Sequence, residues 1–104
     1  MSKNYKVIVF REPNCSPCEL LGTLPSDSAA SKGYEYEEVE LIRKPQEEGD
    51  GWSNAPFAEF YGTPWFVLQD RDISTNLITS ETDSSIVDSF YGGNEARFNI
   101  LINK

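Results

Sequence analysis

The sequence predicts a single α/β domain with a central mixed four-stranded sheet flanked by helices, in the order strand, helix, strand, helix, strand, strand, helix. An apolar, β-branched run over 5–10 precedes a helical pattern and a second strand-like run over 34–41, and strands connected in this way form a right-handed parallel unit. A short polar turn separates an apolar run over 65–68 from a further strand candidate over 73–79. A connection that short joins antiparallel strands, so the sheet is mixed.

Length and composition indicate one globular domain spanning residues 1–104. This length supports one core and is too short for two. Apolar residues make up 38% of the chain and aromatic residues 12%, which is typical of a folded protein. No apolar run is long enough to cross a bilayer, and residues 1–4 lack the apolar stretch of a signal peptide. We therefore expect a cytoplasmic protein without a membrane partner.

The chain is strongly acidic, with a formal net charge of −8. Nucleic acids and anionic membrane surfaces bind to basic faces, so the charge argues against both as partners. Its simplest consequence is solubility. A protein partner is expected to present a neutral or basic surface, and we expect the chain itself to be a monomer.

Helical patterns connect the first two strands. One runs from Pro17 through Leu24, weakened by a glycine and a proline, and 26–31 continues it as a second helical segment. Gly33 is expected to end that segment as a left-handed cap. The following run over 34–41 alternates apolar and acidic residues, which predicts a half-exposed strand whose acidic face meets water.

The second half of the chain carries further helix signals. Trp52 follows a polar loop and is expected to pack in the core, with an exposed partner contact as the alternative. A short helix is expected over Pro56–Tyr61, closed by a glycine. Residues 80–83 resemble a helix start before an apolar face over 86–90, which a Gly-Gly pair ends. Asn94 is expected to cap a last helix.

Cys15 and Cys18 are the only cysteines, and they follow the first strand directly. Two cysteines three positions apart lie on one side of a first helical turn, close enough to form a disulfide. Pro17 between them suits a first turn because its φ is fixed and it has no amide hydrogen. The helix N-terminus favours a thiolate at Cys15. These features predict a reactive dithiol.

Cysteine pairs of this spacing have two other uses in proteins. Zinc needs about four ligands, and the chain has no histidine and no third cysteine, so we expect no metal in a single chain. A dimer that shares a metal or an iron–sulfur cluster stays open. Two inert buried cysteines are the remaining alternative. We expect no cofactor other than a redox-active Cys15–Cys18 disulfide.

These features together resemble the thioredoxin superfamily over nearly the whole chain. The resemblance rests on the first strand, Cys15-Ser16-Pro17-Cys18, the helix before Gly62, and Thr63-Pro64 ahead of an apolar strand. It implies that Pro64 is cis and lies against the cysteines, and that Thr63 offers backbone groups to a substrate strand. Trp65 would border the site or pack in the strand core. Without the resemblance, Pro64 reads as an ordinary proline that opens a strand.

The chain departs from thioredoxins at two positions. Pro17 before the second cysteine is similar to theirs, but Asn14 stands where they usually have tryptophan, and Val9 stands where they have a buried acid. Glu12, Glu19 or water would then accept the proton of the resolving thiol. Charged side chains beside the motif are, however, more commonly solvated surface groups.

Glutaredoxins are the second comparison. The strand followed by a short Pro-Asn-Cys turn is similar to theirs, but Glu12 stands where they typically have a basic residue that helps to bind glutathione. Their Gly-Gly pair follows soon after the cis-proline, whereas Gly92 lies 92 − 64 = 28 positions after Pro64. The acidic charge would also repel glutathione.

The activity that the resemblance implies is reduction of protein disulfides. Cys15 attacks the substrate disulfide as a thiolate, helped by the helix N-terminus and by Arg11, and Cys18 resolves the mixed disulfide. Pro17, Thr63, Pro64 and Trp65 would contact the substrate. Such a protein serves electron transport and cell redox homeostasis, with a thioredoxin reductase or the glutathione system as the upstream reductant. A glutathione-dependent glutaredoxin and a non-enzymatic binding module on the same fold are the alternatives.

Overall fold

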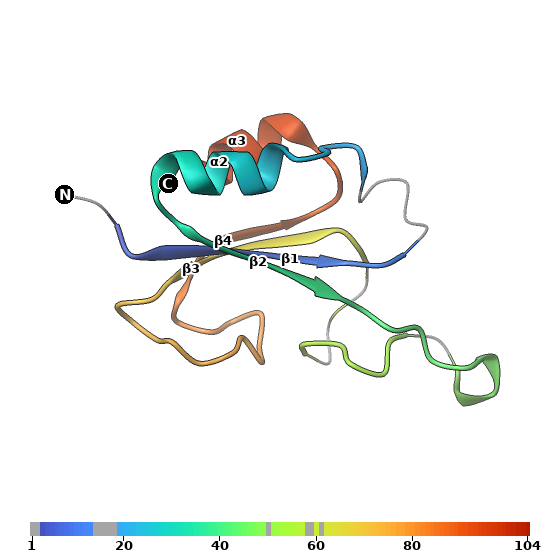
Figure 1. The fold of residues 1–104 in the computed structure, drawn as a ribbon. Coiled ribbons are helices and arrows are strands. Elements are labelled where there is room, and N and C mark those ends of the chain that lie inside the picture. The colour runs from blue at the N-terminus through green and yellow to red at the C-terminus, as the bar shows by residue number, and fades with distance from the viewer. Residues whose placement is uncertain (1–2, 14–18, 50, 58–59, 61) are drawn as a thin grey trace.

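A four-stranded mixed sheet forms the centre of the domain, in the strand order β2-β1-β3-β4 (Figure 1). The computed structural model describes residues 3–13, 19–49, 51–57, 60 and 62–104. The strands are β1 (Tyr5–Arg11), β2 (Glu35–Glu40), β3 (Trp65–Asp70) and β4 (Ile86–Tyr91). β1 is parallel to β2 and antiparallel to β3, and β4 is antiparallel to β3. The predicted mixed sheet is confirmed.

Side chains of the strands alternate between the two faces of the sheet, as extended backbone requires. Val7, Val9 and Phe66 belong to the core beneath the helices, whereas Ile8 and Phe10 belong to a second core on the opposite face. β1 and β3 are the central strands, so both of their faces are buried. This explains why their sequences are continuous apolar runs and that of the edge strand β2 is not.

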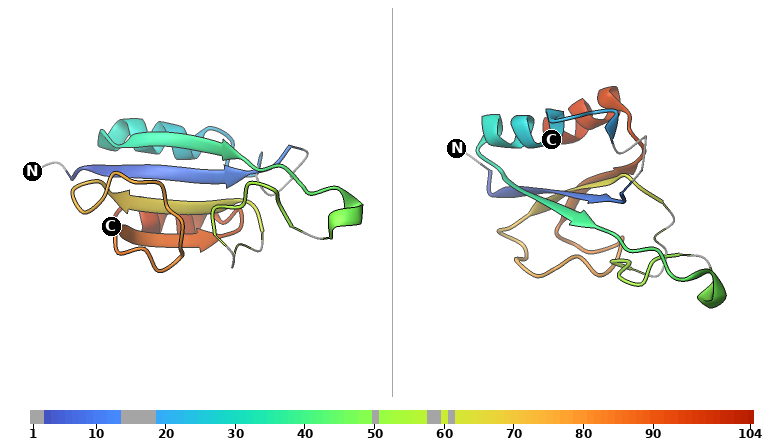
Figure 2. Two further views of the ribbon diagram at one scale, coloured as in Figure 1. Left: turned by 90° about the horizontal axis from the view of Figure 1, so that it is seen from below. Right: turned by 45° about the vertical axis from the view of Figure 1, so that its right-hand side comes forward.

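Two helices, α2 (Leu24–Lys32) and α3 (Glu95–Ile102), lie on the same face of the sheet (Figures 1 and 2). Gly33 ends α2 in the left-handed conformation, with a φ of 75°, as expected. Asn94 caps α3 as expected, because its side-chain oxygen accepts a hydrogen bond from Arg97 N at 2.9 Å. Ala29 of α2 and Phe98 of α3 are fully buried against the sheet. Neither helix is long and apolar enough to cross a membrane, and no other described helix is either.

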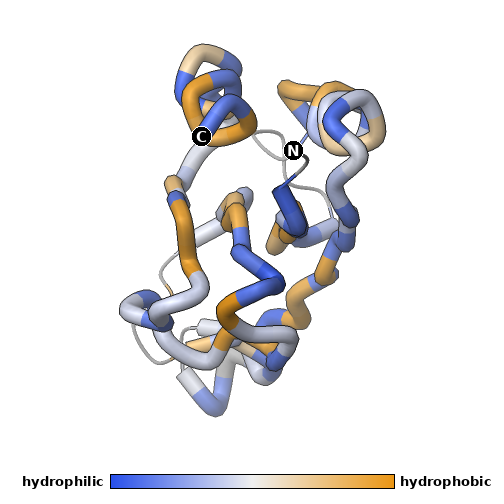
Figure 3. Tube along the Cα trace, turned by 90° about the vertical axis from the view of Figure 1, so that its left-hand side faces the viewer, coloured by the Kyte–Doolittle hydropathy of each residue, from blue (hydrophilic) through white to orange (hydrophobic). Residues whose placement is uncertain are grey.

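The opposite face is covered by the two connections that enter and leave β3, so helices and loops lie on opposite sides of the sheet (Figure 3). The connection between β2 and β3 contains the 3₁₀ turn Gln46–Glu48 and places Trp52 and Phe60 in the core. The connection between β3 and β4 contributes Ile78, whose side chain is 5% exposed. The expected packing of Trp52 in the core is confirmed.

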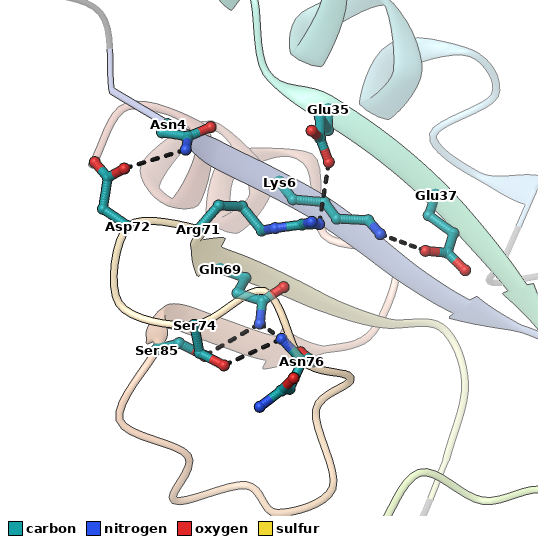
Figure 4. A network of polar contacts seen from close by, with 10 residues as sticks. All are labelled: Asn4, Lys6, Glu35, Glu37, Gln69, Arg71, Asp72, Ser74, Asn76 and Ser85. Carbon is teal, nitrogen blue, oxygen red and sulfur yellow. Dashed lines mark hydrogen bonds and ion pairs between the residues drawn. The ribbon is translucent and has the colours of Figure 1, made fainter.

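A polar network holds the second connection at the end of the sheet where β3 finishes (Figure 4). Gln69 is buried on β3, and its amide donates to Asn76 O at 2.9 Å and to the Ser85 hydroxyl at 3.2 Å. Arg71 donates to Glu35 of β2 at 3.0 Å. Three of the four β2 glutamates form ion pairs, those at 35, 37 and 38, so the acidic strand meets both water and basic side chains.

The prediction for residues 73–91 is wrong. No strand forms over 73–79, which is part of the loop between β3 and β4. The residues expected as a helical face over 86–90 instead form β4, paired with β3 through Phe66 opposite Phe90. Gly92 therefore follows a strand and does not end a helix. Pairing with a strand from elsewhere in the chain outweighed the local helix signal.

Two other helix predictions are confirmed only in part or not at all. In the first, Glu19 is helical and residues 20–23 form turns, whereas the segment expected over 26–31 is helical within α2, which begins at Leu24. In the range Pro56–Tyr61, the described residues 56, 57 and 60 lie in bends and irregular chain. The rest of that range and residues 14–18 lie outside the described part of the chain.

Candidate functional site

β1 ends at Arg11, four residues before Cys15 in the sequence, and the end of the sheet at which β1 finishes is called the site edge here. Cys15, Pro17 and Cys18 lie outside the described residues, so their roles stay predictions. The chain leads to them through Glu12 and Pro13, the last described residues before the motif.

Pro64 lies at the same edge, directly before the neighbouring strand β3. The Thr63–Pro64 peptide bond is cis, as the family resemblance implies, whereas contact between Pro64 and the cysteines stays a prediction. β3 begins directly after it, and Trp65 pairs with Phe10 near the end of β1. Sheet pairing thus brings Pro64 beside the strand that leads to the cysteines.

The end of β4 supports the Pro64 segment from the other side. Gly92 N donates to the carbonyl of Pro64 at 2.9 Å, and Gly92 has a φ of 108°, a conformation that favours glycine. Gly62 packs so tightly against Tyr91 that an added Cβ would lie 2.5 Å from the Tyr91 ring. Sequence reasoning missed this support because it placed these residues in and after a helix.

Thr63 and Trp65 flank Pro64 and are buried to different degrees. Thr63 is partly exposed, whereas the Trp65 side chain is only 5% exposed. The Trp65 ring stacks on Phe60 at a centroid distance of 5.0 Å and meets the edge of Phe57 at 5.2 Å. Trp65 therefore packs in the strand core, and its contact with a substrate stays a prediction.

Glu12 is the charged residue at this edge whose environment differs most from expectation. It was expected to be solvated, but its side chain is only 12% exposed. Trp52 donates its indole N–H to Glu12 Oε1, and Arg43 Nε donates to Glu12 Oε2 at 3.2 Å. Arg43 also lies over the Trp52 ring, 4.6 Å from its centroid. The carboxylate is thus held by two donors from one distant loop, a contact that no local sequence signal indicates.

The other candidates beside the motif are more ordinary. Arg11 forms an ion pair with Glu38 at 3.1 Å, with both side chains partly exposed. Glu19 is exposed. Val9 is 5% exposed and packs in the helix-side core, so an aliphatic side chain stands where thioredoxins are expected to have an acid. A cavity of about 200 Å³ lies beside Glu12 and Pro13, with residues 40–43 as its other wall.

Within the described residues, no group of three or more His, Cys, Asp or Glu side chains is arranged to hold a metal ion. The Pro64 side chain is fully buried, and Trp65 directly after it belongs to the core on the loop-covered face. Glu12 and its two donors lie just beyond the end of β1.

Several solved structures are similar to this chain. The thioredoxin of Fasciola hepatica aligns with a TM-score of 0.64 and 21% sequence identity, covering 98% of this chain and 81% of that one. Thioredoxin f2 of Chlamydomonas reinhardtii aligns with a TM-score of 0.61 and 16% identity, covering 99% and 80% of the two chains. A structure on the thiol resolving mechanism in yeast mitochondrial 1-Cys peroxiredoxin via glutathione/thioredoxin systems aligns with a TM-score of 0.62 and 15% identity, covering 97% and 78%.

No protein-family model matches the chain, and no curated protein does. Identities this low establish a likeness of fold and nothing finer.

Proposed function

This chain has the thioredoxin fold, and from that premise we propose that it is a thiol–disulfide oxidoreductase that reduces disulfides in proteins. In the proposal Cys15 is the nucleophile and Cys18 the resolving thiol. Pro17, Thr63, Pro64 and Trp65 are the residues proposed to contact the substrate.

One observation carries the proposal. The strand that leads into Cys15-Ser16-Pro17-Cys18 ends beside the start of β3, where Phe10 pairs with Trp65 and Pro64 comes immediately before. Sites in α/β sheets are built at the ends of neighbouring strands. β1 leads toward the dithiol sequence at the end of the sheet where Pro64 lies, and this supports a shared site.

The proposed reaction is a two-electron exchange. The Cys15 thiolate attacks one sulfur of the substrate disulfide, which forms a mixed disulfide and releases the other substrate sulfur as a thiolate that takes up a proton. The Cys18 thiolate then attacks the Cys15 sulfur, forms the Cys15–Cys18 disulfide and releases the second substrate thiol. The substrate is reduced by two electrons and the protein dithiol is oxidised by two.

A reductant must then restore the dithiol. We propose a thioredoxin reductase or the glutathione system for this step, and a reducing compartment such as the cytoplasm, where a dithiol is kept reduced. Substrates with neutral or basic surfaces around their disulfide are favoured because the chain carries a net charge of −8.

The test combines turnover with a reduction potential. Wild-type protein is expected to accelerate reduction of insulin by dithiothreitol, Cys15→Ser to lose this activity, and the matched control Ser16→Ala to keep it. A potential of the Cys15–Cys18 couple near about −270 mV supports a reductase, and one near about −120 mV an oxidant. Turnover of hydroxyethyl disulfide with glutathione would favour the glutaredoxin alternative. A partner-binding function that survives Cys15→Ser, without any turnover, would favour the binding module.

A further inference from the structure

Glu12 is joined to Trp65 by a continuous series of contacts on the loop-covered face of the sheet. Trp52 donates its N–H to Glu12, its ring meets the Phe60 ring edge-on at 5.0 Å, and Phe60 stacks on Trp65 at 5.0 Å. Arg43 completes the set by bonding to Glu12 and lying over Trp52. We call these five residues the clamp: Glu12, Arg43, Trp52, Phe60 and Trp65.

The clamp joins the two segments of the proposed site. Its first member, Glu12, is three residues before Cys15, and its last, Trp65, directly follows Pro64. Phe60 also meets the edge of Phe10 at 5.7 Å, so the middle of the clamp is packed against β1. Three of its rings are less than 9% exposed, those of residues 52, 60 and 65, and closely packed aromatic rings move little.

The charge of Glu12 is well suited to hold the clamp together. A carboxylate that is nearly buried needs donors, because burying an unpaired charge is costly. Its two donors come from residues 31 and 40 positions away in the sequence. Both oxygens accept hydrogen bonds from these donors, which argues for a role in holding structure rather than in accepting the Cys18 proton.

We propose that Glu12 is a positioning residue, which through Trp52, Phe60 and Trp65 holds the segment leading to Cys15 in a fixed place relative to Pro64. The proposal rests on the proposed function, in which a protein substrate contacts both segments at once. Loss of the clamp then impairs the reaction with a protein disulfide, which needs both segments. It leaves the reactivity of Cys15 toward a small alkylating agent nearly unchanged, because that reaction needs only the thiol.

The experiment uses the full chain and weakens the Glu12–Trp52 contact from each side. Glu12→Gln removes the charge and leaves one acceptor oxygen for the two donors Trp52 and Arg43, and Trp52→Phe removes the indole N–H while keeping a buried ring. Each is expected to lower kcat/KM for insulin about tenfold. At every pH between about 5 and 9, the rate of Cys15 alkylation by iodoacetamide in each variant should stay within about twofold of the wild-type rate at that pH. The double variant is expected to lose little more than either single one, since both act on one contact.

Two further variants complete the design. Glu35→Gln is the matched control, because Glu35 also pairs with an arginine, Arg71, but at the opposite end of the sheet; it is expected to leave kcat/KM unchanged. Arg43→Met covers the case in which the buried changes prevent folding. The Arg43 side chain is 62% exposed, so this variant should fold and show a smaller loss in the same direction.

An activity-independent measurement separates this proposal from the proposed function. Gly92 N–H bonds to the Pro64 carbonyl and reports on that segment, whereas Gly33 N–H bonds to Ala30 O in α2. Glu12→Gln should speed hydrogen exchange at Gly92 and not at Gly33, whether or not the wild type reduces insulin. A wild type that does not reduce insulin would overturn only the proposed function. Unchanged kcat/KM and unchanged exchange at Gly92 would overturn the clamp. A shifted pH profile of alkylation would also overturn it, by showing that Glu12 acts directly on the thiol.

Discussion

The ion pair between Arg97 of α3 and Asp88 of β4 joins a helix to an edge strand, and its contribution to stability can be predicted. Arg97 Nη1 donates to Asp88 Oδ2 at 2.7 Å and Nη2 donates to Oδ1 at 2.6 Å. Nη2 also donates to the Ser89 carbonyl at 3.1 Å, and the guanidinium lies 5.1 Å from the centroid of the Phe90 ring. The Asp88 side chain is only 14% exposed.

Asp88→Asn keeps the size of the side chain and removes its charge, leaving one neutral acceptor for Arg97. Hydrogen bonds to charged groups contribute about 1.5–3 kcal/mol, and exposed ion pairs about 0–1 kcal/mol. Because the Arg97 side chain is 33% exposed, we take a value at the lower end of the first range, about 1.5 kcal/mol at neutral pH. For a domain of this size, that loss lowers Tm by roughly 6–12 °C.

The stability that the Asp88–Arg97 ion pair contributes should decrease at low pH. Hydrogen bonds from Arg97 hold the pKa of Asp88 below its usual value. A carboxyl group whose pKa is lowered by folding stabilises the native state fully above its unfolded-state pKa of about 3.9, and the stabilisation is lost as pH falls through the lower, folded-state pKa. The difference between wild type and Asp88→Asn should therefore be full at pH 7 and shrink steadily below about pH 4.

The measurement is urea unfolding followed by circular dichroism at pH 7, pH 5 and pH 3. Glu38→Gln is the control, because the Glu38–Arg11 pair is a single bond between side chains that are 47% and 34% exposed. Its loss should cost less than about 0.5 kcal/mol. The reasoning is refuted if Asp88→Asn costs no more than Glu38→Gln, or if its cost is the same at pH 3 as at pH 7.

Three further predictions concern stability and activity. Phe98→Ala empties a fully buried position and should cost about 3–5 kcal/mol in urea unfolding. Gly92→Ala and Gly33→Ala both force a side chain into positive φ, and each should lower the free energy of unfolding by about 1–2 kcal/mol. Only Gly92→Ala should also slow insulin reduction, because Gly92 N–H bonds to the Pro64 carbonyl. Equal activity of the two variants would contradict this. Ser85→Ala removes the hydroxyl that accepts a hydrogen bond from the buried Gln69 amide and donates to Asp83. It should lower stability by about 1–3 kcal/mol, seen as a reduced urea midpoint.

The elements that could be predicted are those that their own residues specify. The apolar runs of β1 and β3 fit only buried strands, and the structure has them at 5–11 and 65–70. Gly33 and Asn94 act as caps through backbone conformation and a side-chain oxygen, which are local properties. Short-range chemistry was sufficient in these places.

The region before and within β4 shows where local chemistry misleads. Ser80 and Asp83 have the side chains of a helix start, but they form turns instead: Ser80 Oγ accepts from Thr82 N at 3.2 Å, and Asp83 Oδ1 accepts from Ser85 N at 2.8 Å. The same oxygens cap helices and turns, so their presence does not distinguish the two. Only pairing with β3 makes residues 86–91 a strand, and that pairing cannot be read from a local window.

The error in β4 also concealed the support of the candidate site. Cys15, Cys18 and Pro64 can be found in the sequence because thiol exchange and the family pattern require particular residue types at particular spacings. Glycine and tyrosine at positions 62, 91 and 92 carry no such signature. They matter because β4 lies beside β3, which brings Tyr91 against Gly62 and Gly92 to the Pro64 carbonyl. Glu12 is similar, since its partners are 31 and 40 positions away. Residues that perform chemistry are therefore easier to predict than residues that hold them in place, and substitutions at the second kind give the more demanding test of the structure.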